Sequence, residues 1–368
     1  MNDYSSPIWE AKAHTLAKHQ ILKTYLNAWM PIMSKKFNKE LLFVDGFAGP
    51  GVYENGEDGS PILAIKLVLE HTHDFPVPVN FWFIEDKEER YNILCDIISQ
   101  LQNQISNCSK IQNIVTKRGD CETILNTVLD DYEAQKKQFG PALVFLDQFG
   151  YSDVSMDLIK RIMEKPSCEV FSYLNWKDMD RFIADQSKWG SINKAFGGEE
   201  WKKVQEFPTD QKPNYMLKTY KTALKSRAMS KYVLDFAMCD GNDRLLYWLF
   251  FCTNNLRGLE EMKKSMCKVD STCGFRFSDK YNSSGRHLFR NEDVDVVAQD
   301  IFSKYQGKQC TVLQIKEFVL SDTRFCLFKS SLKMLEKDGK LEAVNPPAKR
   351  RAGTFAEDSM VVKFISSS

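Results

Sequence analysis

The chain has 368 residues, of which 43% are hydrophobic and 27% charged, the composition of a folded globular protein large enough for two domains. No apolar run approaches the roughly 18 residues that a membrane span needs, and the N-terminus lacks a secretory signal pattern, so we predict a cytoplasmic protein. The ten cysteines are scattered, with no C-x-x-C pair. This favours buried free thiols over zinc ligands or disulfides, and no metal site is predicted.

Charge is unevenly distributed along the chain. The whole chain carries a net charge of +1, but residues 1–201 carry 21 basic against 29 acidic residues, and residues 202–290 carry 17 against 9. The basic middle segment indicates either a surface that binds a phosphate backbone or an ordinary solvated helical surface.

An amphipathic helix is expected first, because apolar residues recur at three- and four-residue steps between residues 8 and 37. Pro31 is expected to kink or split this helix. The next segment, LLFVDGFAGPG at residues 41–51, is a short apolar run that ends in Asp45 and continues into glycines. This pattern is typical of a buried parallel strand followed by a tight loop, which serves either as a structural turn or as a ligand site.

Three further strands are predicted to end in an acid, each followed by a helical pattern or a short loop. They are VNFWFIED at 79–86, IQNIVTKRGD at 111–120 and the start of PALVFLDQFGY at 141–151, and residues 168–174 form a fifth strand. Strands that alternate with helices predict a parallel sheet, which binds ligands beyond the carboxyl ends of its strands. The acids at positions 45, 85, 120 and 147 would all lie at that edge.

The pattern changes after residue 175. Residues 176–228 are predicted to be a polar, aromatic helical insertion, and the apolar runs at 231–240 and 244–253 an antiparallel hairpin that completes the sheet. A helix follows at 255–269. From residue 291 the sequence predicts three short helices and a terminal pair of β-strands. This order is typical of a winged helix-turn-helix domain. Its wing would be residues 345–358, with Lys349, Arg350 and Arg351 at the tip.

The order of the strand-end acids resembles a class I S-adenosylmethionine-dependent methyltransferase. That resemblance implies a Rossmann-like fold with a mostly parallel seven-stranded sheet, helices on both faces, and S-adenosylmethionine as the cofactor. It also implies roles for residues around three strand ends. The loop after the first strand would wrap the methionine part, Glu85 would hold the ribose hydroxyls and Asp120 with Cys121 would lie near the adenine; the residues of the first loop are Asp45, Gly46, Phe47, Gly49 and Gly51.

The resemblance narrows to the three-Cys-motif partner protein family, TcmP, over essentially the whole chain. The segments that carry it are KHQILKTYLNAW at 18–29, DGFAGPGVYENGEDGSP at 45–61, FLDQFGY at 145–151 and TNNLRGLEEMKKSM at 253–266. The family name implies a three-Cys-motif protein as partner. One departure is Gln148, which stands where the family usually has proline; this loosens the turn that positions Asp147.

Asp147 and Phe149 also resemble the D-P-P-Y element of amino-group methyltransferases. In that element the acid accepts a hydrogen bond from the target nitrogen and the aromatic ring stacks on a flat base, whereas Phe149 could equally pack against the sheet edge. Lys18 and His19 match the family pattern and are candidate substrate contacts. Asn175 and Arg181 are further candidates, although the arginine could equally pair with a local acid.

Two functions from different classes remain open. The first is a methyltransferase that modifies a nucleic acid or a nucleotide-like acceptor together with its partner. The second is a non-catalytic binding module with the same fold. A nicotinamide dehydrogenase is disfavoured, because GFAGPG spaces its glycines as G-x-x-G-x-G rather than G-x-G-x-x-G. The expected domains are residues 1–290 and 291–368, and the second would contact DNA, RNA or protein.

Overall fold

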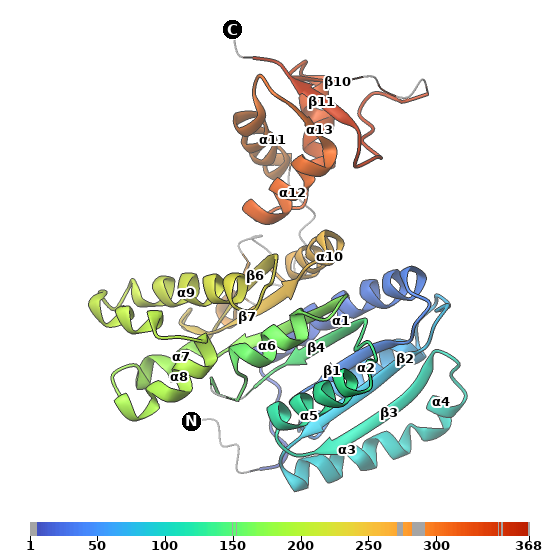
Figure 1. Cartoon of the computed structure of the whole chain (residues 1–368), viewed down its shortest axis with the longest axis vertical. Helices are drawn as coiled ribbons and strands as arrows, with labels where there is room; N and C mark the ends of the chain where they lie inside the picture. Colours follow the sequence, from blue (N-terminus) through green and yellow to red (C-terminus); the bar gives the residue numbers. More distant parts are fainter. Residues whose placement is uncertain are drawn as a thin grey trace. The chain divides into compact units, whose positions relative to one another are not determined.

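The computed structural model describes residues 6–366 except 149, 152, 271–274, 282–290, 345 and 347–348 (Figure 1). The chain divides into two compact units. The first comprises Met1–Glu261 with Arg276–Asn282, and the second comprises Met262–Phe275 with Ser283–Ser368. Each unit has a hydrophobic core of its own. No helix within the described ranges is long and apolar enough to cross a membrane.

An eight-stranded sheet with the order β3-β2-β1-β4-β5-β7-β6-β8 forms the centre of the first unit. Its strands are β1 (Leu41–Asp45), β2 (Val79–Glu85), β3 (Ile111–Arg118), β4 (Ala142–Leu146), β5 (Cys168–Leu174), β6 (Tyr232–Cys239), β7 (Leu245–Thr253) and β8 (Arg276–Ser278). Every residue of β1 and β4 is buried, which explains why these strands are continuous apolar runs. The predicted α/β fold with a large, mostly parallel sheet is confirmed.

One strand of the sheet, β7, runs opposite to the others. Strands β3, β2, β1, β4 and β5 are parallel, whereas β7 is antiparallel to both of its neighbours, β5 and β6. The predicted hairpin is therefore present. The three-residue strand β8 pairs in parallel with β6 and was not predicted from the sequence. Because β2 and β4 flank β1 on opposite sides, their crossover connections leave the sheet in opposite directions, which opens a crevice at the carboxyl end of β1.

Helices cover both faces of this sheet. They are α1 (Ala13–Lys36), α2 (Ser60–Leu69), α3 (Glu88–Gln100), α4 (Gln102–Ser106), α5 (Cys121–Ala134), α6 (Met156–Met163) and α10 (Leu256–Cys267), with a short 3-10 helix, η3 (Asp279–Tyr281). The insertion after β5 contains α7 (Trp176–Phe182), η1 (Gln186–Lys188), α8 (Trp189–Phe196), η2 (Glu200–Glu206) and α9 (Lys212–Ser226). In Figure 1, α5 and α6 lie in front of the sheet. They share a core cluster with the helices of the insertion and with Leu42 and Val44 of β1.

Helix α1 continues through Pro31, so of the two predicted effects, a kink or a split, the split is wrong. A proline lacks the N–H that would bond to the carbonyl four residues earlier, which here belongs to Asn27. The His71 side chain compensates, because its Nε2 lies 3.3 Å from the Asn27 carbonyl oxygen. A tertiary contact that the local sequence does not encode thus keeps the helix intact.

A buried carboxylate ties α1, β5 and β7 together. Glu169 on β5 is 3% exposed and accepts hydrogen bonds from the Tyr25 hydroxyl (2.5 Å) and the Thr253 hydroxyl (2.6 Å). Burial raises the pKa of Glu169, and the two hydroxyl donors act against that rise. Gly258 on α10 packs directly on this group: a Cβ there would lie 2.1 Å from Glu169 Oε1 and 3.1 Å from Thr253 Oγ1.

We therefore expect Gly258→Ala to lower the free energy of unfolding by about 3 kcal/mol, because the added methyl group would displace a fully hydrogen-bonded carboxylate. Gly190→Ala in α8 is the matched control, since a Cβ there meets nothing within 4 Å. Its free energy of unfolding should stay unchanged or rise by up to about 1 kcal/mol. Urea denaturation of both variants measures the effect, and equal stabilities would contradict this account of Gly258.

The second unit contains three helices and a small antiparallel sheet. Its elements are α11 (Asn291–Tyr305), β9 (Gln309–Thr311), α12 (Val312–Asp322), α13 (Phe328–Lys337), β10 (Leu341–Val344) and β11 (Val361–Phe364), with the strand order β10-β11-β9. A capping box begins α12, where Thr311 and Gln314 satisfy each other's backbone N–H groups. The three helices and the terminal β-pair match the predicted order, β9 was not predicted, and the winged helix-turn-helix assignment stays a prediction.

Candidate functional site

The loop after β1 needs glycine at three positions for different reasons. A Cβ on Gly46 would lie 2.5 Å from the Cys121 Sγ, so glycine lets the loop pass against the start of α5. Gly49 and Gly51 have positive φ angles of 64° and 79°, which only glycine adopts readily. Inside the turn, the Phe47 N–H donates to Asp45 Oδ1 (3.1 Å). These contacts fix the backbone of the loop without a ligand.

Glu85, at the end of β2, lies behind this loop. Its Oε2 accepts from the Gly49 N–H (2.9 Å) and its Oε1 from the Lys87 N–H (2.9 Å), and the residue is 3% exposed. Burial raises the pKa of Glu85 against the lowering effect of the Lys87 N–H. Glu85 therefore connects the loop to β2. Each carboxylate oxygen retains a lone pair for a further donor.

Asp120 and Cys121 lie where α5 begins. Asp120 is the N-cap, and its Oδ1 accepts from the backbone N–H (2.8 Å) and the hydroxyl (2.7 Å) of Thr123. Cys121 is 3% exposed, and burial raises the pKa of its thiol well above the ordinary value. The structure thus places both residues in the start of this helix, outside the cavity described next.

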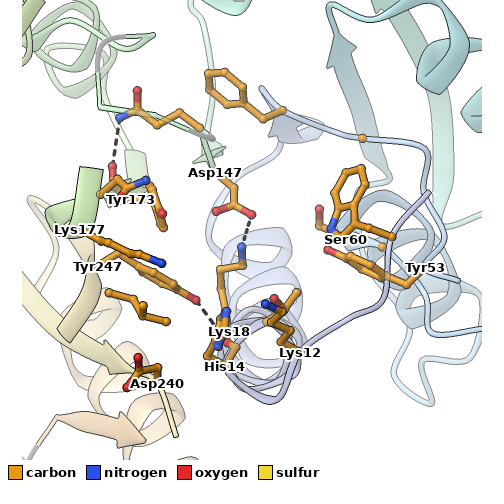
Figure 2. A pocket seen from close by; sticks show the side chains of 18 of the residues that line it. Lys12, His14, Lys18, Tyr53, Ser60, Asp147, Tyr173, Lys177, Asp240 and Tyr247 are labelled. Carbon is orange, nitrogen blue, oxygen red and sulfur yellow. Dashed lines mark hydrogen bonds and ion pairs between the residues drawn. The ribbon is translucent and has the colours of Figure 1, made fainter. Parts of the chain in front are cut away.

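A cavity of about 860 Å³ opens at the carboxyl edge of the sheet, on the side of β1 that faces β4 and β5 (Figure 2). This volume suits a ligand the size of a cofactor or a nucleotide. The glycine loop forms part of its wall, and the start of α1 and the β6–β7 turn form other parts. Its lining includes the predicted residues Phe47, Gly49, Gly51, Lys18, Asp147, Asn175 and Arg181.

Lys18 and Asp147 form an ion pair inside the cavity (Figure 2). The side chains are 8% and 18% exposed, so little water competes with the pair. Lys18 comes from α1 and Asp147 from the end of β4, 129 residues apart in the chain. The fold thus unites two residues that the sequence suggested for separate reasons. Phe149 lies outside the described residues.

Gln148 fixes the turn that follows β4. It is 3% exposed, its Nε2 donates to the Tyr173 carbonyl (3.1 Å), and its Oε1 accepts from the Asp153 N–H (3.0 Å). The side chain therefore ties the end of β4 to β5 on one side and to the following loop on the other. The loosening expected from the loss of proline is offset by these two hydrogen bonds.

A histidine–carboxylate pair and two tyrosines form another part of the cavity wall. His14 Nδ1 lies 2.9 Å from Asp279 Oδ2, and the Tyr247 hydroxyl lies 3.4 Å from the His14 carbonyl oxygen. Burial lowers the pKa of His14, although the hydrogen bond that its ring donates to Asp279 acts to raise it. The Tyr173 and Tyr247 rings lie with their centroids 4.4 Å apart. Aromatic rings and polar groups thus share one wall.

The remaining candidates occupy different settings. Asn175 caps α7, where its Oδ1 accepts from the Asp178 N–H (3.0 Å). The Arg181 side chain is 60% exposed and lies 3.7 Å from Asp178. His19 does not line the cavity: it is 4% exposed, its ring packs beside Tyr53, and burial lowers its pKa to about 3.

Several cavity residues carry no signal in the sequence. They come from the residue before α1 (Lys12), from α7 (Lys177) and from the β6–β7 hairpin (Asp240 and Tyr247), and no motif spacing connects them. Trp9 belongs to the same wall, where the Arg90 guanidinium lies 4.7 Å from its ring centroid. Its carbonyl accepts from the Glu54 N–H (3.0 Å), so the segment before α1 pairs with the long loop after Gly51.

The three basic residues predicted for the tip of the wing differ in their surroundings. Lys349 and Arg351 are exposed. The Arg350 side chain is only 9% exposed and forms two parallel bonds to Glu336 on α13, of 2.8 and 2.9 Å. Burial acts to raise the pKa of Glu336, but Arg350 and the Gly353 N–H outweigh it and hold that pKa below its ordinary value. Arg350 therefore anchors to α13 the segment in which the wing is predicted.

Comparison with known proteins finds no matching family model and no matching curated protein. Three similar solved structures have low identity to this chain. A Legionella pneumophila protein of the DUF519 family is 13% identical with a TM-score of 0.38, over 66% of this chain and 86% of that one. A Staphylococcus aureus protein assigned as a caffeoyl-CoA O-methyltransferase is 10% identical with a TM-score of 0.30, over 62% and 82%.

The third is a Streptomyces avermitilis protein of the DUF574 family, which is 8% identical with a TM-score of 0.29, over 64% of this chain and 83% of that one. Similarity at this level carries no argument about activity, cofactor or acceptor. Conclusions about chemistry therefore rest on the cavity itself.

Proposed function

We propose that this protein is an S-adenosylmethionine-dependent methyltransferase that modifies an amino nitrogen of a nucleic acid or nucleotide-like acceptor. The observation that carries the proposal is the position of Asp147, which lines the same 860 Å³ cavity as the glycine loop after β1. A cofactor at the loop and an acceptor at the carboxylate would meet within one cavity. Bringing the two reactants together in this way supplies much of the rate of a group transfer.

The residues of the first loop fit such a cofactor. A Cβ on Gly49 would meet only Trp9, at 4.0 Å, so the loop backbone is otherwise open at this position, and it lines the cavity. Asp45 is fully buried, and its Oδ2 has no partner with hydrogen-bond geometry among the described residues, although the Ser60 hydroxyl lies close to the carboxyl group. We propose that the loop and Asp45 hold the methionine part and that Glu85 holds the ribose hydroxyls, while the roles of Asp120 and Cys121 near the adenine stay predictions from the resemblance. The bound cofactor would supply an electrophilic methyl group.

The acceptor would bind beside Asp147. The carboxylate would accept a hydrogen bond from the amino N–H and so aim the nitrogen lone pair at the methyl group. In the structure this carboxylate is paired with Lys18, which holds it in place before the acceptor arrives. Tyr173 and Tyr247 line the cavity, where an aromatic ring can stack on a base, and stacking contributes about 1–3 kcal/mol per base.

Cationic side chains in the cavity favour an acceptor that carries phosphate. Lys12, Lys177 and Arg181 line the cavity together with Lys18, and Arg181 is largely exposed. We propose further that the second unit is a winged helix-turn-helix domain that delivers nucleic acid, and that the three-Cys-motif protein implied by the family resemblance is the partner. Reconstitution of activity with that protein tests this last step; an unchanged rate would count against it.

Calorimetric titration with S-adenosylmethionine tests the cofactor assignment. We expect saturable binding by the wild type and at least tenfold weaker binding by Glu85→Ala, because that variant loses the ribose acceptor and frees the Gly49 N–H. Glu88→Ala is the matched control, since its carboxylate is 70% exposed and pairs with Arg118. No binding by the wild type would overturn the proposal, and equal loss in both variants would overturn the role of Glu85.

A non-catalytic binding module is the second candidate. The Lys18–Asp147 ion pair favours it, because the carboxylate that should receive the acceptor is already engaged. A screen of labelled methyl transfer to DNA, RNA and cell extract separates the two functions. Transfer by the isolated chain to any acceptor excludes the binding-module hypothesis.

A further inference from the structure

The second unit has a row of lysines along one side of helix α13. Lys329, Lys333 and Lys337 follow one another at intervals of four residues, and all three are exposed. Residues four apart lie on the same side of an α-helix, with a rise of about 6 Å between them. These side chains therefore project from one line on the surface of the unit.

None of these three lysines has an ion-pair partner among the described residues. The acidic residue of the helix that could neutralise them, Glu336, is instead held by Arg350 and by the Gly353 N–H (2.5 Å). The charge of the row is thus left uncompensated, as expected of a surface that meets a polyanion.

The wing lies beside the row. A Cβ on Gly353 would be 2.9 Å from Lys333 Cγ, so the backbone of the wing packs against the stem of that lysine. Arg350 fixes the same segment to α13, while Lys349 and Arg351 on either side of it are exposed. Arg350 therefore holds the exposed side chains of Lys349 and Arg351 near the three lysines of α13.

From these contacts we infer that Lys329, Lys333 and Lys337, with Lys349 and Arg351, form a face that binds the phosphate backbone of duplex DNA without reading its sequence. The exposed side chains of α13 are three lysines and one serine, and none is the arginine, asparagine or glutamine that reads base edges in pairs of hydrogen bonds. A helix enters the major groove of B-form DNA but not the narrow groove of duplex RNA, which favours DNA. The inference concerns the second unit and holds whether or not the first transfers methyl groups.

Fluorescence anisotropy of the full-length protein with a 20-base-pair DNA duplex, between 50 and 200 mM salt, tests this face. Each lysine that neutralises a phosphate contributes about 0.9 to the slope of log affinity against log salt. We expect Lys329→Gln/Lys337→Gln to reduce the slope by about 1.8, so that the loss of affinity over this salt range becomes about 12-fold smaller. Binding of a second duplex of unrelated sequence should be equal within threefold.

The matched control is Lys304→Gln/Lys308→Gln, which removes the same charge from α11 and the turn after it, and its slope should equal that of the wild type. Equal slopes for both double variants would contradict the inference that the lysines of α13 bind DNA. Equal or tighter binding of an RNA duplex of the same sequence would overturn the assignment to DNA. If the α13 variant bound DNA normally but lost affinity for a polyglutamate probe, the face would be a protein-docking surface and the inference would be wrong.

Discussion

Asp147→Ala should lower the rate of methyl transfer by about 10²–10³-fold, the usual cost of removing one preorganised group that orients or stabilises the reacting atoms. The side chain lies in the cavity with only 18% exposure, so water replaces its hydrogen bond poorly. Cofactor affinity should change by less than threefold, because the glycine loop, not Asp147, holds the methyl donor in our proposal. Single-turnover rates with labelled cofactor, and calorimetry on the same samples, provide the two measurements.

Asp147→Ala needs a control, because it leaves the positive charge of Lys18 without a partner. Without Asp147, Lys18 would be a buried cation without its partner, which itself destabilises a protein. The double variant Lys18→Met/Asp147→Ala removes both charges and should be as inactive as the single variant while melting closer to the wild type. Activity of either variant within threefold of the wild type would exclude the proposed role of Asp147.

The second large effect concerns the pH dependence of stability. Burial raises the pKa of Asp45 from 3.8 to about 7, against hydrogen bonds from Ser60 and the Phe47 N–H. A carboxyl whose pKa is raised on folding stabilises the folded state fully below its unfolded pKa, and this contribution is lost as pH rises through the folded value. At about 1.4 kcal/mol per pKa unit, the loss between pH 4 and pH 8 amounts to about 4 kcal/mol.

Asp45→Asn keeps the shape of the side chain but cannot ionise. We expect the free energy of unfolding of the wild type, relative to this variant, to fall by about 4 kcal/mol from pH 4 to pH 8. Glu133→Gln provides a control of opposite sign, because the Lys165 hydrogen bond lowers the pKa of Glu133, so that its contribution is lost as pH falls. Urea denaturation at each pH measures both series. A difference between wild type and Asp45→Asn that does not vary with pH would contradict the raised pKa.

The sequence predicted the central strands of the sheet well, because burial on both faces is encoded in the residues of each strand itself. Strands such as β1 and β4 are buried on both faces, so they must be continuous apolar runs, and the hairpin of β6 and β7 follows from two such runs around a short turn. The strands β8 and β9 have three residues each and exist only through pairing with a distant partner. Their sequences contain no pattern that could have revealed them.

The cavity was predicted only in part for a similar reason. The glycine loop and Asp147 lie within recognisable motifs, but Lys12, His14 and Tyr247 reach the cavity from segments over 200 residues apart. Charge patterns also fail to separate functional from structural cations. Arg350 stands between two exposed basic residues in the sequence, and only its ion pair with Glu336 on α13 shows that it points inward.

The side chain of Gln148 bears on which substitutions the turn after β4 should tolerate. Its amide uses one donor and one acceptor at once, toward the Tyr173 carbonyl and the Asp153 N–H. A side chain that supplies only one of these groups would hold the turn from one side alone and leave a buried polar group on the other without a partner. Tolerance at this position therefore depends on bifunctional hydrogen bonding and not on polarity alone.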